Sequence, residues 1–329
     1  MPLGASTRNA GFSCFGSPSE ILSDIKLMGE EKAGALVRKR WAGLQKLQKR
    51  LTGSNAQYQN LGGYELYHEE EFDRIKPDIN YLNDLMSDIL HHPNVFSSIP
   101  VPDGIRGFSN SIHNHLEGQL HPGYMMDHLT NIFLKLGGHI RTGLNIEGIE
   151  DAGDKVFLLN SVSMPIEARK VVVATNAYAA QLINGLDMHP ARNHVMVTTA
   201  VDGLMWKGSF HYNEGFYYFR NIGNRILLGG ARNQDFETEN TADFGTNPVI
   251  IDTLTRFLYN HLASAGHTHI EYQWSGIFAV GPEKWPIVKA VSDNVFVGVR
   301  CSGMGIALAS LIGEELADLA CNSDQQHNV

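Results

Sequence analysis

A glycine-containing turn near the end of the chain has the residue types needed to bind a ligand through the backbone. It joins the apolar run Val295–Val299 to a segment whose apolar residues recur at helical spacing, and it consists of Ser302, Gly303, Met304, Gly305 and Ile306. The pattern predicts a buried strand, a tight turn and a helix. Glycines let a ligand approach closely, and the free N–H groups at the helix start favour an electron-rich group. The alternative is a loop that only packs the helix against the strand.

Two further stretches of small and polar residues supply possible partners for this turn. One follows the β-branched run Val171–Val173 and consists of Ala174, Thr175 and Asn176. The other is a polar loop near the start of the chain that closes on a glycine: Ser6, Thr7, Arg8, Asn9, Ala10 and Gly11. We expect the three stretches to act together, since a single glycine-containing turn is a weak signal.

Together these stretches resemble the flavoprotein family of D-amino acid oxidase, glycine oxidase, sarcosine oxidase and γ-glutamylputrescine oxidase, over nearly the whole chain. The segment from Trp274 through Gly276 to Pro286 also resembles the family's W-x-G … D-x-x-P pattern, with Glu283 where an aspartate is usual. The resemblance implies that FAD is the cofactor, bound noncovalently, and that the three stretches face it. It further implies flavin-domain contacts for Gly276 and a backbone contact between Ile146 and the adenine.

The resemblance also implies an α/β fold in which an FAD-binding Rossmann-like domain is interleaved with an antiparallel-sheet substrate domain. We assign residues 1–55, 117–188 and 274–329 to the first domain, and residues 56–116 and 189–273 to the second. The implied activity is oxidation of the C–N bond of an amine or amino acid by hydride transfer to flavin N5, with oxygen or a quinone as electron acceptor.

Candidate substrate contacts lie on a strand rich in aromatic residues. Alternation along residues 215–220 places Phe216, Tyr218 and Arg220 on one face. In the resembled family the corresponding sheet lies over the flavin, so Tyr218 and Arg220 are our candidate catalytic residues; the alternative is an ordinary sheet core. Phe278 stands where amino-acid oxidases of the family often have an arginine for the substrate carboxylate. We therefore expect amines to be preferred over free amino acids unless Arg220 or Arg300 binds a carboxylate.

The family's nucleotide-binding fingerprint G-x-G-x-x-G does not occur in the 329 residues. We therefore expect the reading frame to begin upstream, and the present chain to bind FAD at least ~100-fold more weakly than an extended one. Without that unit we expect Val295–Val299 to form an unpaired sheet edge. The alternative function is a catalytically silent binding or scaffolding protein that has lost FAD together with this unit.

Other chemistries lack their motifs. The 15 histidines include neighbouring pairs, but no H-E-x-x-H run and no cysteine spacing indicates a metal site. No G-x-S-x-G elbow is present, so a serine hydrolase is not supported.

Composition limits the class of partner. The net charge of −9, without a long basic run, argues against nucleic-acid binding. Three cysteines without metal or disulfide spacing suggest a cytoplasmic protein, and no apolar run approaches the ~18 residues that span a bilayer. The expected partner is a small amine or amino acid.

The periodicity of apolar residues predicts the elements that position these groups. We expect helices over residues 18–51, 73–90, 124–136 and 253–261. We expect strands over residues 62–68, 139–146, 156–159, 171–173, 193–200, 215–219 and 225–230, the last two joined by the turn Asn221-Ile-Gly-Asn.

Overall fold

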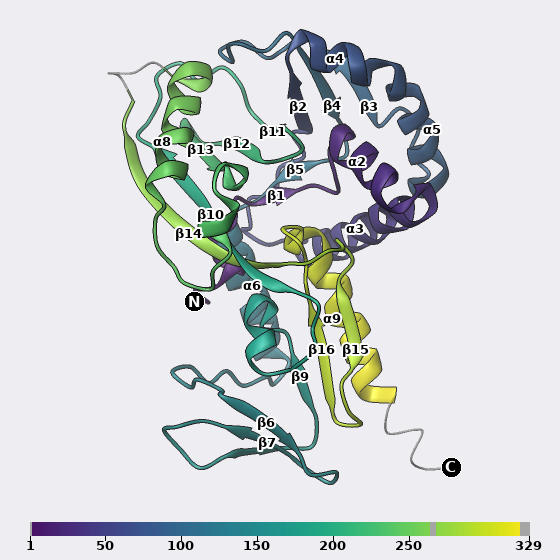
Figure 1. The fold of residues 1–329 in the computed structure, drawn as a ribbon, viewed down its shortest axis with the longest axis vertical. Coiled ribbons are helices and arrows are strands. Elements are labelled where there is room, and N and C mark those ends of the chain that lie inside the picture. The colour runs from purple at the N-terminus through teal and green to yellow at the C-terminus, as the bar shows by residue number, and fades with distance from the viewer. Residues whose placement is uncertain (1, 264–267, 323–329) are drawn as a thin grey trace.

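The computed structural model describes residues 2–263 and 268–322. A large sheet with helices around it forms the upper part of the molecule in Figure 1, and two small sheets with α6 and α9 form the lower part. The mixed α/β architecture and its antiparallel sheet confirm the predicted fold class.

The large sheet has eight strands in the order β14-β10-β13-β12-β11-β2-β4-β3. Neighbours pair antiparallel, except that β11 pairs parallel with β2. The strands are β2 (Gly63–Tyr67), β3 (Phe96–Ile99), β4 (Asn110–Asn114), β10 (His189–Thr198), β11 (Ser209–Tyr212), β12 (Tyr217–Ile222), β13 (Arg225–Gly230) and β14 (Ile270–Val280). The predicted antiparallel group is confirmed, with Ile222 opposite Arg225 at the predicted turn.

Alternation along these strands gives the sheet two faces. On one face Phe210, Phe219 and Leu228 pack against α8 (Pro248–Phe257), which continues as the π-helical turn η4 (Leu258–Leu262). On the other face Tyr218 packs with Val195, Leu227 and Trp274. The second face looks towards the N-terminal segment, which contains α1 (Ala5–Arg8) and β1 (Phe12–Ser13); β1 pairs with β5 (Gly118–Gln119).

A second sheet has the order β15-β16-β9 and carries the glycine turn. Its strands are β15 (Ile287–Ala290), β16 (Val295–Val299) and β9 (Val171–Val173); β16 is entirely buried and runs parallel to β9. The expectation of an unpaired edge at Val295–Val299 is wrong, because β15 pairs with the other side of β16. Among the described residues β15 and β9 are the edge strands of this sheet, and β16 lies between them. Helix α9 (Gly305–Asn322) covers β16.

The predicted helix over residues 18–51 is two helices. Gly29 has φ 85°, which ends α2 (Pro18–Met28) and starts α3 (Glu30–Arg50). Apolar periodicity continues through the break, so only the glycine marks it. Helices α4 (Glu69–Ile75) and α5 (Ile79–Leu90) are joined by η1 (Lys76–Asp78) and pack with α2 and α3 against the β2–β3–β4 side of the large sheet (Figure 1).

The predicted strand over residues 139–146 is wrong: this segment has no regular structure, and β6 begins only at Gly148. Glycines at 137, 138 and 143 and the exposed side chain of Ile140 leave little to stabilise a strand there. The segment follows α6 (Pro122–Lys135). Strands β6 (Gly148–Asp151), β7 (Val156–Leu159) and β8 (Ile166–Ala168) form a three-stranded antiparallel sheet.

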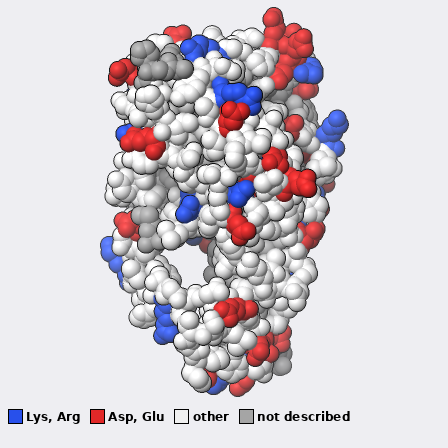
Figure 2. Space-filling view, turned by 60° about the vertical axis from the view of Figure 1, so that its left-hand side comes forward, with Lys and Arg blue, Asp and Glu red and all other residues white. Residues whose placement is uncertain are grey.

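The remaining elements are short: η2 (Asn176–Gln181), η3 (Arg232–Gln234) and α7 (Phe236–Glu239). The domain boundaries stay a prediction; the large sheet continues through β14 to Val280, past the assigned boundary after residue 273. Acidic and basic side chains are interspersed on the face shown in Figure 2, which is hollowed in its lower half. Across residues 2–263 and 268–322, no helix is long and apolar enough to cross a membrane, and no group of three metal-ligating side chains occurs.

Candidate functional site

The turn that follows β16 has an unusual backbone and unused donors. Arg300 and Ser302 have positive φ values of 62° and 48°, and Gly303 has 84°. Such values strain residues other than glycine and occur preferentially at binding sites. Within the described chain, the N–H groups of Gly303, Gly305 and Ile306 donate to no carbonyl or side chain, and the Ser302 hydroxyl is buried without a partner. The turn therefore presents several donors to one place.

Asn176 connects this turn to the one that follows β9. Its side-chain Oδ1 accepts a hydrogen bond of 3.1 Å from the backbone N–H of Arg300, and Asn176 itself has φ 45°. The predicted Ala174–Asn176 and Ser302–Ile306 stretches are thus brought together at the ends of two parallel strands. In α/β sheets this edge is where ligands bind.

The Arg300 side chain is not available to a ligand. Its Nε donates to the Trp285 carbonyl at 2.8 Å, and its Nη1 donates to the Asp187 carbonyl at 2.9 Å. These bonds hold two segments against the turn: the residues just before β15, which include Trp285, and those just before β10, which include Asp187. Arg300 therefore supports the turn and does not supply the carboxylate partner considered for it.

The loop of residues 6–11 lies against β14. The Trp274 indole donates to the Arg8 carbonyl at 2.8 Å, and Arg8 Nη1 donates to the Ser275 carbonyl at 3.0 Å. A methyl group added at Gly276 would lie 3.4 Å from Arg8 Cβ, so the loop and Gly276 are in direct contact. Asn9 closes the loop by accepting the Gly11 N–H at 2.9 Å.

The continuation of this loop reaches the α9 turn. Cys14 Sγ lies 3.9 Å from the sulfur of Met304. The structure therefore places Asn176 next to Arg300, Gly276 next to Arg8, and Cys14, three residues beyond Gly11, next to Met304. Ile146 lies in the irregular segment just before β6, which Figure 1 shows in the lower part of the molecule. Contact between any of these residues and a flavin stays a prediction.

Arg220 is committed to the protein itself. Its guanidinium is buried, Nε donates to the Ala10 carbonyl, and Nη2 donates to the Leu120 carbonyl at 3.1 Å. Desolvation lowers its pKa to about 10. Gly11 permits the arrangement, because a Cβ there would lie 2.2 Å from the Leu120 carbonyl. We therefore interpret Arg220 as a residue that positions the loop of residues 6–11, rather than as a substrate contact.

Tyr218 is better placed for a ligand. Its ring packs edge-to-face on Phe12 at 5.7 Å and lies across Gly229, where an added Cβ would be 2.5 Å from the ring. Burial raises the pKa of its phenol, so the group is a neutral donor at physiological pH. No described residue accepts from or donates to its hydroxyl at hydrogen-bond distance.

A buried acidic group beside the loop was not foreseen from the sequence. Glu117 accepts the N–H groups of Phe15 at 3.0 Å and of Gly16 at 3.4 Å, and burial raises its pKa to about 8. Glu65 accepts from the Ser19 N–H at 2.9 Å and from the Tyr67 hydroxyl. The only signal for this group in the sequence is that a glutamate directly precedes the residues that form β5, Gly118–Gln119.

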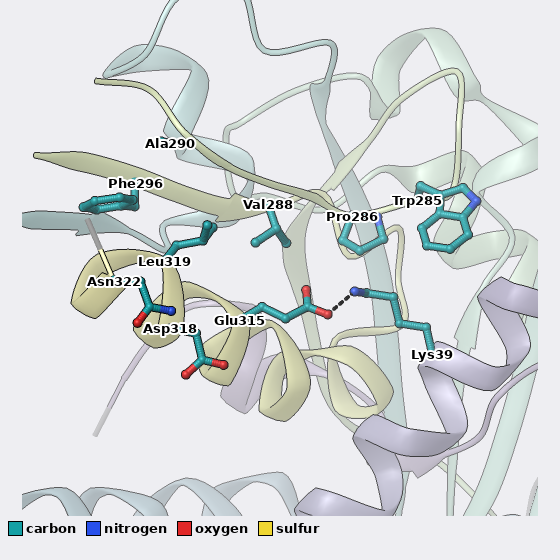
Figure 3. A pocket seen from close by; sticks show the side chains of 10 residues that line it. All are labelled: Lys39, Trp285, Pro286, Val288, Ala290, Phe296, Glu315, Asp318, Leu319 and Asn322. Carbon is teal, nitrogen blue, oxygen red and sulfur yellow. Dashed lines mark hydrogen bonds and ion pairs between the residues drawn. The ribbon is translucent and has the colours of Figure 1, made fainter. Parts of the chain in front are cut away.

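The cleft in Figure 3, with a volume of about 610 Å³, is not this site. It lies between β15 and the C-terminal half of α9, where Lys39 bridges to Glu315 at its mouth. Glu315 is ten residues beyond the first residue of α9, which corresponds to about 15 Å of helix.

Comparison with known proteins identifies the family of this chain. The sequence model of the family described as FAD dependent oxidoreductase matches residues 1–319. Similar solved structures include glycine oxidase from Bacillus cereus ATCC 14579, with 15% identity, TM-score 0.73 and coverage of 98% of this chain and 88% of that one. L-proline dehydrogenase from P. horikoshii has 15% identity, TM-score 0.76 and coverage of 96% and 83%. Iminodiacetate oxidase from Chelativorans sp. BNC1 has 16% identity, TM-score 0.75 and coverage of 98% and 87%.

Proposed function

The chain belongs to the FAD dependent oxidoreductase family, and from this premise we propose that it oxidises the C–N bond of a small amine or amino acid. FAD is its cofactor. Oxygen or a quinone would serve as the acceptor that reoxidises the bound cofactor. The alternative of a cofactor-free binding protein is not favoured, because the family match extends over almost the entire chain.

The observation that carries this proposal is the set of unused donors in the α9 turn. Three backbone N–H groups and the buried Ser302 hydroxyl have no partner within the described chain. The Ser302 hydroxyl is buried and such donors are normally satisfied, while Gly303 is exposed and Gly305 and Ile306 are half-buried, so a ligand with acceptor atoms can reach this turn. The pyrimidine edge of a flavin has such acceptors, and the positive end of the α9 dipole favours the negative charge that this edge gains on reduction.

The residues of the chain then have separate tasks. When bound, FAD accepts a hydride from the carbon next to the substrate nitrogen. The turn at Ser302–Ile306 holds and polarises one edge of the cofactor. Asn176 keeps that turn in its strained form, Arg220 fixes the loop of residues 6–11, and Tyr218 offers a neutral hydroxyl to the substrate. No general base is required if the amine reacts in its neutral form.

A spectroscopic experiment tests the proposal. The purified chain is titrated with FAD, and the visible flavin spectrum is followed with and without a panel of primary amines, secondary amines and amino acids under anaerobic conditions. We expect at least one member of the panel to bleach the flavin band. Ser302→Ala and Tyr218→Phe separate the roles, because the first weakens FAD binding and the second leaves it unchanged while slowing reduction. A chain that binds no FAD, or FAD that no amine reduces, contradicts the proposal.

A further inference from the structure

Arg232 is a partly buried cation with no hydrogen-bond acceptor. It begins η3, separated from the end of β13 by Ala231, and no carboxylate or carbonyl of the described chain lies within hydrogen-bond distance of its guanidinium. Every other described arginine that is not exposed makes at least one hydrogen bond; they are Arg8, Arg40, Arg50, Arg192, Arg220, Arg225 and Arg300. Removing a guanidinium from water without hydrogen-bond partners costs free energy, and a bound anion would offset that cost at Arg232.

Two aromatic rings hold the guanidinium in place. Its central carbon lies 4.6 Å from the ring centroid of Phe236 and 5.7 Å from that of Phe278. Ring faces stabilise a cation but accept none of its five N–H donors in the plane. The planar group is thus held while its hydrogen-bonding edge stays unused. This is the form in which arginine binds a carboxylate through two parallel hydrogen bonds.

Phe278 places Arg232 on the face of the sheet that carries the candidate site. Residues 274, 276 and 278 alternate onto one side of β14. Trp274 packs there with Tyr218, and Gly276 contacts the loop at Arg8. Because the Arg232 guanidinium lies beside the Phe278 ring, it shares the face that holds Tyr218.

A buried ionic cluster fixes the segment that begins with Arg232. Glu239, fully buried, accepts from Arg192 Nη2, His194 Nε2 and Asn247 Nδ2, each at 2.9 Å. Glu239 is therefore neutralised by Arg192, with the imidazole of His194 and the amide of Asn247 as further partners. The carboxylate of Glu239, whose charge acts on Arg232, is in this way already hydrogen-bonded to other residues.

We propose that Arg232 binds a carboxylate of the substrate, so that the protein acts on an amine that carries a carboxylate group. The inference rests on the proposed function, and it names the substrate class of that site. Arg232 takes the place of the arginine that is missing at Phe278, because the aromatic ring there supports a cation delivered from the end of β13. Phe236 closes the other side of the guanidinium.

Calorimetric titration of the purified 329-residue chain tests this without turnover. The ligands are matched sets: an amino acid, its methyl ester and the amine that lacks the carboxylate. We expect the amino acid of at least one set to bind ~10-fold or more tightly than its ester and amine. Arg232→Met should abolish that preference, Arg232→Lys should retain part of it, and Arg256→Met should leave it unchanged, since Arg256 is exposed on α8.

Equal binding of acid and ester, no carboxylate binding to the wild-type chain, or a preference that survives in Arg232→Met would each overturn the proposal. FAD content is measured separately from the visible spectrum. A flavin-bound chain without carboxylate preference contradicts the role of Arg232 alone. A preference that depends on Arg232 in a chain unable to bind FAD contradicts the proposed oxidation alone. Far-ultraviolet circular dichroism of each variant confirms that it is folded.

Discussion

Asn176 Oδ1 lies 3.1 Å from the backbone nitrogen of Arg300, and both residues are held in the left-handed region, at φ 45° and 62°. The bond joins two turns that are 124 residues apart in the sequence. Each strained turn is stabilised by the other, and both turns contain residues predicted to contact the flavin.

Replacement of Asn176 should therefore affect both stability and cofactor binding. Asn176→Ala removes the acceptor and places a less tolerant residue at positive φ, so we expect a loss of about 2 kcal/mol in the free energy of unfolding. We also expect FAD affinity to fall about tenfold. Asn176→Asp keeps an acceptor and should retain most of both. Urea unfolding and FAD titration of the two variants measure this, and an unaffected alanine variant would contradict the role of the bond.

Two glycines of α3 give a matched test of the packing behind the α9 turn. A Cβ at Gly43 would lie 1.9 Å from the Ala307 carbonyl, whereas one at Gly34 meets side-chain atoms of Ile89 and Leu85 at 3.6 Å and beyond. Gly43→Ala should cost about 3 kcal/mol or more, because the two helix backbones must separate. Gly34→Ala should be neutral or stabilising by about 0.5–1 kcal/mol. Thermal and urea unfolding distinguish them, and similar stabilities of the two variants would refute the close approach.

Tyr218 and Tyr217 alternate on β12 and test which face of the sheet serves the substrate. Tyr218→Phe removes the hydroxyl next to the candidate site, and kcat/KM should fall about three- to tenfold for the loss of one neutral hydrogen bond. Tyr217 stacks on Phe257 on the other face, 4.9 Å between ring centroids, so Tyr217→Phe should leave kcat/KM unchanged. Steady-state rates with the best amine give the comparison. A larger effect of Tyr217→Phe would show that the substrate binds on the opposite face of the sheet from Tyr218.

The buried carboxyl of Glu117 predicts a pH dependence of stability. Burial raises its folded-state pKa to about 8, above the ordinary value of an unfolded glutamate, near 4.3. The native state thus holds the proton more tightly, and the free energy of unfolding should fall as pH rises from about 4.3 to 8. Glu117→Gln mimics the protonated form and should remove this slope, becoming the more stable protein near pH 8. The exposed Glu69→Gln controls for loss of a charge.

Urea unfolding across this pH range provides the measurement. Parallel stability profiles for the wild type and Glu117→Gln would contradict a raised pKa. The same slope in both Gln variants would show that another group is responsible.

Local patterns predicted the elements that carry the site, while distant contacts decided its details. The β-branched run before Ala174 and the Asn221-Ile-Gly-Asn turn determine β9, β12 and β13 through local preferences, and these predictions are confirmed. The break at Gly29 was missed because the apolar repeat continues across it. The segment of residues 139–146 was predicted as a strand from its composition, but it has no partner to pair with among the described strands.

The side-chain roles required the fold. Arg220 and Tyr218 do share a sheet face, as alternation predicts, but only the structure shows that Ala10 and Leu120 occupy the guanidinium. Of the two rings beside Arg232, Phe236 is only four positions along the chain, but Phe278 lies 46 positions further along and reaches Arg232 only through pairing of β10 with β13 and β14. Contacts of this range carry no local pattern.

The central claim is that this chain uses FAD to oxidise an amine, and anaerobic reduction of its flavin tests that claim most directly. FAD-loaded protein is mixed with the carboxylate-bearing and carboxylate-free amines, and the visible flavin band is followed before air is admitted. We predict that a carboxylate-bearing amine bleaches the band, that air or a quinone restores it, and that acid precipitation then releases the yellow colour into the supernatant. A flavin band that no amine bleaches, or a protein that takes up no FAD, would contradict the account.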